Sequence, residues 1–440
     1  MNRSSQPPMV MLRRCDHYDH ETLCAIIRDG IFAMGARPRG RILIKPNIVT
    51  ANRDYIHHSY TEPRMLGAMV QVLREHGDCG AITVGESGGI GMPSRLFFAE
   101  SGIRALCRSL GVPLVDFNEE QTREVALHRA KWHHTVALAK SILEADYRVW
   151  MPKLKFHIVT GITNALKLNM GILTHRERFI YHDDRLHEKI VDLLEPGYPD
   201  LIVTDAVTIG RGFESSPYPV HLGAVLIAND PLAADMVAAR ILGYRPQDIR
   251  HLAEAAHRGY GSLDMARITI TGDVSIEALA HQIKDVDSPF QDLQKLDTPL
   301  RFYEGINRQS GNICDGGCIC SIKGVLGTAE KRFPGNLKGA RPGAIVMGYY
   351  RGEVIHPGQP VALIGACAGV DGRLVAGKVI RMRGCPVRVK DMMLFLLHRF
   401  GLRSPAFDPR NLRLLLYHSL INGLMRLSIP LRPGARLDSR

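Results

Sequence analysis

Cysteine residues are unevenly distributed along this chain. Five of the nine lie close together in the last third, and they are Cys314, Cys318, Cys320, Cys367 and Cys385. The first three form the pattern C-x3-C-x-C in the segment NICDGGCICS. Because glycine lets a backbone turn tightly, this segment could direct several thiolates toward one centre. Four thiolates suit either a zinc ion or an iron–sulfur cluster, and this spacing is typical of neither a zinc ribbon nor a bacterial ferredoxin.

The two later cysteines could join the same centre. Cys367 and Cys385 each follow an apolar run that predicts a strand, and parallel strands end at one edge of a sheet. Cys385 precedes Pro386 and a predicted helix, whose N-terminus would favour thiolate over thiol. Of the five, Cys320 is the least expected ligand. The alternative role, as small buried hydrophobic residues, is the one we favour for the early cysteines, which are Cys15, Cys24, Cys79 and Cys107.

A second group of reactive side chains lies in the segment 151–171, MPKLKFHIVTGITNALKLNMG. Lys153 and Lys155 share a face if this segment is extended, and His157 joins them. A buried lysine can act as a base and histidine can transfer protons, so we treat these three as candidate catalytic residues. Nearby donors complete a candidate site for a carboxylate or phosphate, and they are Asn164, Lys167 and Asn169. A solvated basic loop is the alternative.

Other polar residues follow predicted strands and are candidate ligand-binding groups. Lys45 and Asn47 end the first strand of this kind, and Glu86 ends another. Asp205 and Glu214 flank the glycine-containing loop TIGRGFE, where they could hold a lysine or a ligand hydroxyl. The chain contains neither a GxGxxG nor a Walker A motif, so we do not predict a nucleotide.

Short apolar runs alternate with amphipathic patterns and predict the elements that position these residues. Strands are predicted at 41–47, 81–87, 147–153, 201–207, 223–230 and 267–273. Helices are predicted at 63–77, 96–111 and 231–243. This alternation indicates an α/β fold with a mainly parallel sheet and helices on both faces.

The organisation predicts two domains. We assign 1–275 to the α/β domain with the basic pocket, 276–310 to a linker, and 311–400 to a smaller C-terminal α/β domain that carries the cysteine cluster. The second domain has predicted strands at 344–350, 361–367 and 378–385, then a helix at 387–401. Residues 401–440 form a basic amphipathic tail. We expect its leucines to pack on their own domain, with peripheral contact to a membrane or a partner as the alternative.

Composition excludes several classes of protein. The chain has 440 residues, of which 45% are hydrophobic and 23% charged, which is typical of a globular protein. It contains no uninterrupted apolar run of the ~20 residues that a membrane-spanning helix needs, and no signal peptide pattern, so we expect a cytoplasmic protein. The net charge of +12 permits an anionic partner, but no nucleic-acid-binding motif is present and we predict none.

Five segments, taken in order, resemble the family called domain of unknown function 362. They are ILIKPN, TVGES, PKLKFHIVTGITNALKLNMG, TDAVTIGRGFES and GAVLIANDPLAADMVA, within about residues 40–245, and a weaker resemblance continues to about residue 390. The resemblance implies an iron–sulfur cluster and a redox setting, because family members are described as cluster-associated. The chain lacks a ferredoxin-type insert, and Val387 stands where the related pattern has a second proline.

Together these features predict an iron–sulfur protein that acts as an oxidoreductase on an anionic small molecule, with a redox partner protein. The expected cofactor is a [4Fe–4S] cluster on Cys314, Cys318, Cys367 and Cys385, with zinc as the alternative. Two other functions remain open. One is a non-redox isomerase or hydrolase with a structural zinc, and the other is an electron-transfer or cluster-scaffold protein without catalysis.

Overall fold

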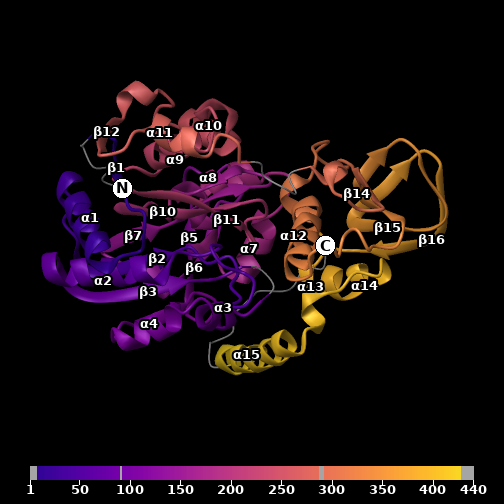
Figure 1. The fold of residues 1–440 in the computed structure, drawn as a ribbon, viewed down its shortest axis with the longest axis horizontal. Coiled ribbons are helices and arrows are strands. Elements are labelled where there is room, and N and C mark those ends of the chain that lie inside the picture. The colour runs from indigo at the N-terminus through magenta and orange to yellow at the C-terminus, as the bar shows by residue number, and fades with distance from the viewer. Residues whose placement is uncertain (1–6, 90–91, 287–291, 428–440) are drawn as a thin grey trace.

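The computed structural model describes residues 7–89, 92–286 and 292–427. A large sheet with its helices forms one part, and a smaller sheet, in orange in Figure 1, forms the other. The last residues of the predicted tail, 428–440, lie outside the described residues, as do 287–291 in the predicted linker.

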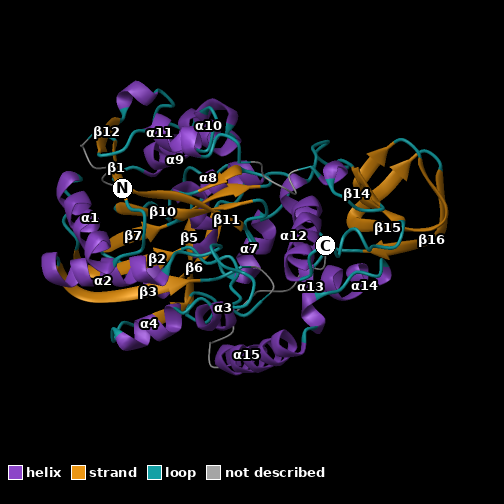
Figure 2. Ribbon diagram, viewed as in Figure 1, coloured by secondary structure: helices purple, strands orange, loops and turns teal. Residues whose placement is uncertain are grey.

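The large sheet has ten strands and is mostly parallel (Figure 2). Its main order is β12-β1-β11-β10-β7-β2-β3-β4, with β8 beside β10 and β9 beside β8. The strands are β1 (Met9–Arg14), β2 (Arg39–Pro46), β3 (Asp78–Glu86), β4 (Leu114–Asp116), β7 (Tyr147–Met151), β8 (Lys153–His157), β9 (Gly161–Thr163), β10 (Leu201–Arg211), β11 (Tyr218–Ala228) and β12 (Thr269–Gly272). Antiparallel pairs are β1–β11, β10–β11 and β8–β9. The predicted α/β class is confirmed as a mixed α/β fold.

Both faces of this sheet are covered. Along β2 the side chain of Leu43 enters one core, whereas Ile42 and Ile44 enter the core on the opposite face. Alternate side chains of a strand point to opposite faces, so a run of apolar residues needs a cover on each side. The helices of this part are α1 (His20–Ala33), α2 (Pro63–His76), α3 (Ser94–Glu100), α4 (Ile103–Ser109), α5 (Lys140–Glu144), α6 (Ala165–Leu168), α7 (His175–Tyr181), α8 (Leu186–Asp192), α9 (Pro231–Ile241), α10 (Arg250–His257) and α11 (Ile276–Gln282).

The prediction of a single helix at 96–111 is wrong. The segment forms two short helices, α3 and α4, and Gly102 between them has a φ of 84°. This left-handed conformation stops α3 and redirects the chain, which glycine permits without strain. A pattern of apolar residues alone does not reveal such a break.

The smaller sheet has four strands that pair in parallel, in the order β13-β14-β15-β16. They are β13 (Leu300–Glu304), β14 (Gly343–Arg351), β15 (Val354–Asp371) and β16 (Leu374–Met382). Helix α12 (Cys320–Arg332) connects β13 to β14. Cys367 was predicted at the end of a strand, but it lies inside β15, because β15 continues to Asp371. Cys385 lies in the loop after β16.

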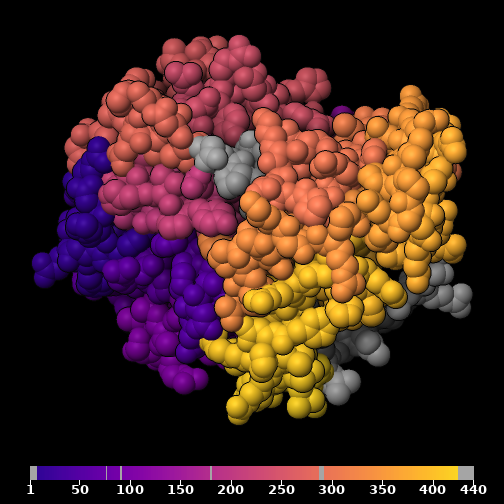
Figure 3. Space-filling model, turned by 45° about the vertical axis from the view of Figure 1, so that its right-hand side comes forward, coloured from indigo at the N-terminus to yellow at the C-terminus, as the bar shows by residue number. Residues whose placement is uncertain are grey.

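The chain ends in a series of helices. The helix predicted at 387–401 begins at Val389 and contains a wider turn, so it comprises α13 (Val389–Asp391), η6 (Met392–Leu396) and α14 (Leu397–Arg399). The last helix is α15 (Pro409–Leu427). None of the helices in the described ranges has the length and apolar content needed to cross a bilayer. In Figure 3 these yellow segments lie against the larger part of the molecule.

Helices α8 and α10 meet at two buried histidines. The rings of His187 and His251 stack with centroids 6.0 Å apart, and neither ring nitrogen of His187 has a hydrogen-bond partner among the described residues. Burial, aided by the neighbouring His251, lowers the pKa of His187 to about 3. The ring is therefore neutral in the folded protein at pH values where it would be protonated in the unfolded chain.

Because of His187, we expect the free energy of unfolding to fall as the pH is lowered. A group with a lowered folded pKa contributes stability above its unfolded pKa, near 6.5, and loses it as the pH falls toward the folded value. Between pH 7.5 and pH 5.0 we expect the wild type to lose about 2 kcal/mol more unfolding free energy than His187→Leu. Urea unfolding at both pH values measures this difference. His257→Gln, which changes an exposed histidine on α10, should behave as the wild type; equal losses in all three proteins would contradict the assignment.

Candidate functional site

A cavity of about 400 Å³ lies between the carboxyl edge of the large sheet and the C-terminal helices. Strands β2, β3, β7 and β10 run in the same direction, so their carboxyl ends meet at this edge. The opposite wall comes from α12, from residues 387–394 and from the start of α15. One end of the cavity is lined by charged groups and the rest largely by apolar side chains, which include Leu96, Phe97, Phe213 and Met393.

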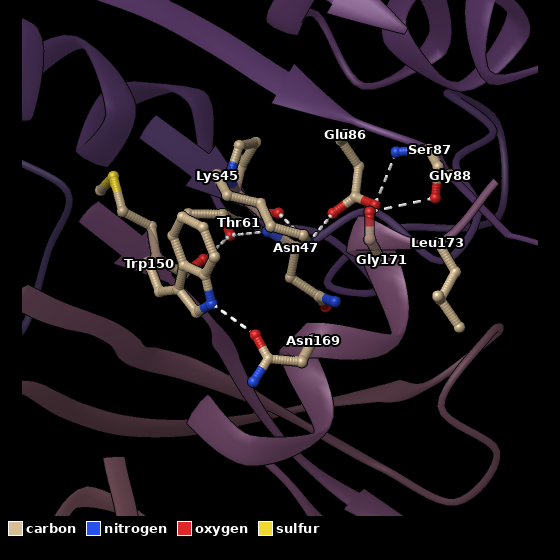
Figure 4. A network of polar contacts seen from close by, with 12 residues as sticks. Lys45, Asn47, Thr61, Glu86, Ser87, Gly88, Trp150, Asn169, Gly171 and Leu173 are labelled. Carbon is tan, nitrogen blue, oxygen red and sulfur yellow. Dashed lines mark hydrogen bonds and ion pairs between the residues drawn. The ribbon is translucent and has the colours of Figure 1, made fainter. Parts of the chain in front are cut away.

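Lys45 and Glu86 form an ion pair at this edge (Figure 4). The two residues lie at the carboxyl ends of β2 and β3, and both side chains are almost completely buried. Glu86 also accepts a hydrogen bond from the backbone N–H of Ser87 at 2.8 Å. Burial lowers the pKa of Lys45, and the charge of Glu86 opposes that change. Both residues line the cavity, as the sequence suggested from their positions at strand ends.

Lys155 lies beneath the cavity and supports it. Its ammonium group donates to Asn47 Oδ1 at 2.5 Å and to the carbonyl of Ser59 at 2.9 Å. Burial lowers the pKa of Lys155 well below its usual value. Asn47 lines the cavity whereas Lys155 does not, so Lys155 positions Asn47 and does not face a ligand.

His157 and Glu214 face each other across the polar end. His157 Nδ1 accepts from the backbone N–H groups of Val159 and Thr160, at 3.0 and 3.1 Å. The neutral ring therefore carries its proton on Nε2, which lies 3.4 Å from Glu214 Oε1. Burial and the neighbouring Lys167 lower the pKa of His157 well below its usual value, so the ring is a neutral donor.

Lys167 is a cation of this site that is free to bind a ligand. Among the described residues, no hydrogen-bond or ion-pair partner contacts its ammonium group, and Glu214 Oε2 also has no hydrogen-bond partner. Burial lowers the pKa of Lys167 while the charge of Glu214 raises it. The thiol of Cys320 shares this region: its pKa is raised by burial and by the charge of Glu214. Cys320 thus faces this cavity and not the other cysteines.

Arg178 is a site residue that the sequence did not reveal. It lies on α7, lines the cavity, and donates to Ser87 Oγ and to the carbonyl of Gly88. Burial lowers its pKa to about 10. A polar helical segment gives no sign that one of its arginines is buried against Ser87 and Gly88 and lines a cavity.

Three candidates from the same segment lie outside the cavity. Lys153 forms a buried ion pair with Asp205 at 2.8 Å, and the hydroxyl of Tyr18 contacts both groups at 2.8 Å. Asn164 accepts from Thr204 Oγ1 at 2.9 Å, and Asn169 accepts from Trp150 Nε1 at 2.7 Å (Figure 4). These contacts pair Lys153, Asp205 and Asn164 within the fold, whereas Asn169 Nδ2 has no hydrogen-bond partner among the described residues. None of the four lines the cavity, so we leave them out of the reacting machinery.

A second, smaller cavity is lined by four cysteines: Cys314, Cys318, Cys367 and Cys385. A Cβ atom added at Gly365 would lie 3.3 Å from Cys318 Sγ and 3.8 Å from Cys367 Sγ, so these two sulfurs are within about 7 Å of each other. A Cβ atom at Gly317 would lie 2.6 Å from Cys314 Sγ. The glycines therefore leave the space in which the thiols gather.

The charges around the cysteines are mixed. Burial raises the pKa of Cys318 to about 11, although the N–H of Val387 donates to its sulfur and opposes the rise. Arg308 lowers the pKa of Cys367, and Lys189 lowers that of Cys385, in both cases against the larger effect of burial. These cations would stabilise thiolates.

A zinc ion and an iron–sulfur cluster place different requirements on the cysteine cavity. Within the described residues, no three Cys, His, Asp or Glu side chains converge closely enough to hold one metal ion. Zinc in a four-thiolate site needs every sulfur about 2.3 Å from one point. A [4Fe–4S] cluster binds each cysteine through a different iron atom, so it needs four sulfurs around a cavity. The four cysteines lining one cavity match the second requirement.

The two cavities are neighbours. His182 and Pro386 line both of them. His182 Nδ1 lies 3.0 Å from the carbonyl of Arg178, and burial lowers the pKa of His182 to about 3. The walls of the ligand cavity and of the cysteine cavity thus share a neutral imidazole and a proline ring.

Comparison with known proteins places the polar end of the site within one family. The family model for "Domain of unknown function (DUF362)" matches residues 42–240. This region of the chain belongs to the DUF362 family. The DUF362 region contains Lys45, Glu86, His157, Lys167 and Glu214, whereas the four clustered cysteines lie beyond it.

One curated relative and one solved structure add to this comparison. The thylakoid-associated protein sll1697 of Synechocystis sp. is 26% identical over 264 residues, which cover 57% of this chain and 79% of that protein. The lactate racemase apoprotein of Thermoanaerobacterium thermosaccharolyticum aligns with a TM-score of 0.38 and 10% identity. That alignment covers 55% of this chain and 57% of the racemase, so the chain spans little more than half of the racemase's length.

Proposed function

We propose that the protein binds a [4Fe–4S] cluster through Cys314, Cys318, Cys367 and Cys385, and that it is an oxidoreductase acting on an anionic small molecule. The observation that carries the proposal is the wall of His182 and Pro386 shared by the two cavities. When bound, such a cluster supplies reversible electron transfer. A ligand in the larger cavity would then lie close to the electron source.

The residues of the larger cavity indicate the chemical class of the ligand. The free ammonium group of Lys167 attracts a carboxylate or phosphate, and the neutral His157 donates its Nε2 proton toward Glu214. The apolar walls, including Leu96 and Phe213, exclude water and need an apolar surface to cover them. The ligand class is therefore an acid with an apolar body.

Two other functions fit the geometry less well. A structural zinc needs ligands that converge on one ion, and no three side chains in the described ranges do so. A pure electron carrier has no need of a large cavity beside its cluster. The free cation and the unpartnered oxygen of Glu214 inside that cavity favour an enzyme.

Anaerobic purification with iron and sulfide analysis tests the proposal. We expect about four iron atoms and four sulfides per chain, with a broad visible absorption that bleaches on reduction. One zinc atom without sulfide would support the structural-metal alternative. Protein without any metal, never exposed to air, would reject the cluster.

Removal of the Lys167 charge should weaken ligand binding. Decanoate serves as a probe because it combines a carboxylate with an apolar chain. We expect Lys167→Met to bind decanoate about tenfold more weakly than the wild type by calorimetric titration, since a charge-assisted hydrogen bond is lost. Lys338→Met changes an exposed lysine and should leave the affinity unchanged. Equal affinity in both variants would place the anion elsewhere.

A further inference from the structure

Helix α15 is held on the protein by polar contacts and leaves several leucines exposed on its other side. On its inner side, Asn411 accepts from Asn52 Nδ2 at 2.8 Å, and Asn422 donates to Glu119 Oε1 at 2.9 Å. Arg410 forms ion pairs with Glu100 and Asp54. These contacts anchor the helix in this orientation beside α3, at the lower edge of Figure 1.

The outer side of α15 carries a stripe of leucines. Leu412, Leu416, Leu420 and Leu424 follow one another at intervals of four residues and so share a face. They are 41%, 62%, 63% and 56% exposed. We expected the leucines of this segment to pack on their own domain. Leu414 does so, whereas the four leucines of the stripe do not. A contiguous exposed stripe of this kind marks an interaction surface.

The charge around the stripe indicates what covers it. Residues 397–440 contain eight arginines and two aspartates, so they hold six of the twelve net positive charges on a tenth of the chain. Arg413 is exposed beside the stripe. Two copies docked through this face would bring two such basic segments together and repel each other. An anionic lipid surface satisfies both the leucines and the arginines.

We propose that α15 docks the protein on an anionic membrane surface, with its leucines in the boundary between headgroups and acyl chains and its arginines at the phosphates. This surface goes beyond the proposed enzymatic function and does not depend on the cluster. Leu414 and Leu415, on the inner side of the same helix, line the large cavity, and so does Leu412 at the near end of the stripe. Docking would therefore place an acid-binding cavity beside a source of apolar molecules.

Vesicle sedimentation with the full chain tests the proposal. We compare phosphatidylcholine vesicles with vesicles that also contain phosphatidylglycerol. The wild type should bind the anionic vesicles, and less so at high salt. The variant Leu416→Ser/Leu420→Ser should bind them on the order of tenfold more weakly, since it removes apolar area from the interface. Phe32→Ser is the control, because Phe32 is 89% exposed on α1, and it should bind as the wild type.

Three results would overturn the membrane surface. The first is a wild type that does not bind anionic vesicles, and the second is a double variant that binds them unchanged. The third is a wild-type dimer, seen by sedimentation velocity, that the double variant converts to a monomer, because the stripe would then be an interface between two copies. Since both leucines are exposed, the double variant should unfold at the same urea concentration as the wild type.

Discussion

Replacing Cys385 with alanine should remove more than half of the iron from protein purified without oxygen. Alanine offers no ligand, and a [4Fe–4S] cluster with three thiolates loses iron readily. Cys385 lines the cysteine cavity but is itself exposed, so its side chain contributes little to the core. We therefore expect the variant to fold as the wild type while its visible absorption falls. Iron and sulfide analysis of both proteins, side by side, measures the effect.

Cys320→Ala provides the matched control for this experiment. Cys320 lies two residues after Cys318 in the chain, yet it faces the ligand cavity and not the other four cysteines. The control should keep the iron content of the wild type. If Cys385→Ala retains all its iron, or if Cys320→Ala loses as much, the assignment of the four ligands fails. This pair of variants tests the geometry, because the sequence pattern C-x3-C-x-C does not distinguish Cys318 from Cys320.

The fold could largely be predicted from periodicity, since each element carries its own signal. Apolar runs indicated six of the ten strands of the large sheet. The helix predicted at 231–243 is α9, where Asp230 accepts from the N–H of Ala233. What failed depends on a local backbone choice or on distant packing. Gly102 divides one predicted helix, and β15 runs past Cys367.

Part of the site could also be predicted, because ligands of parallel sheets bind at strand ends. That rule identified Lys45 and Glu86, which do line the cavity. The rule does not predict that Lys153 and Lys155 have different roles. The neighbours of each lysine come from residues far away in the sequence. Lys153 is covered by Tyr18, whereas Lys155 reaches Asn47.

The residues that the sequence did not reveal are brought to the site by long-range packing. Arg178 and His182 come from α7 and the residue after it, in a stretch whose polar composition is typical of an exposed helix. Both line the same cavity as Glu86 at a strand end and Pro386 in the C-terminal segment. No pattern within a few residues of Arg178 records those contacts.

The buried pair of Lys45 and Glu86 should dominate the stability of the ligand site. Glu86→Gln keeps the shape of the side chain but leaves the ammonium group of Lys45 buried without its counterion. We expect a loss of about 3–5 kcal/mol in the free energy of unfolding, the range found when one partner of a buried ion pair is removed. Urea unfolding of the anaerobically purified protein measures it. Glu75→Gln, which breaks the exposed pair of Arg28 and Glu75 at 2.8 Å, should cost less than about 1 kcal/mol.

The double variant Lys45→Met/Glu86→Leu separates the charge from the packing. It removes both charges and fills most of the same volume, so it should recover most of the stability that Glu86→Gln loses. A ligand anion, however, would then face an apolar wall where Lys45 stood, so decanoate should bind more weakly than to the wild type. If the double variant is as unstable as Glu86→Gln, the cost arises from packing around Gly171, where an added Cβ would lie 2.4 Å from both Lys45 Nζ and Glu86 Oε1. A stable double variant that binds decanoate more weakly than the wild type would show that this pair is retained for its ligand and not for the fold.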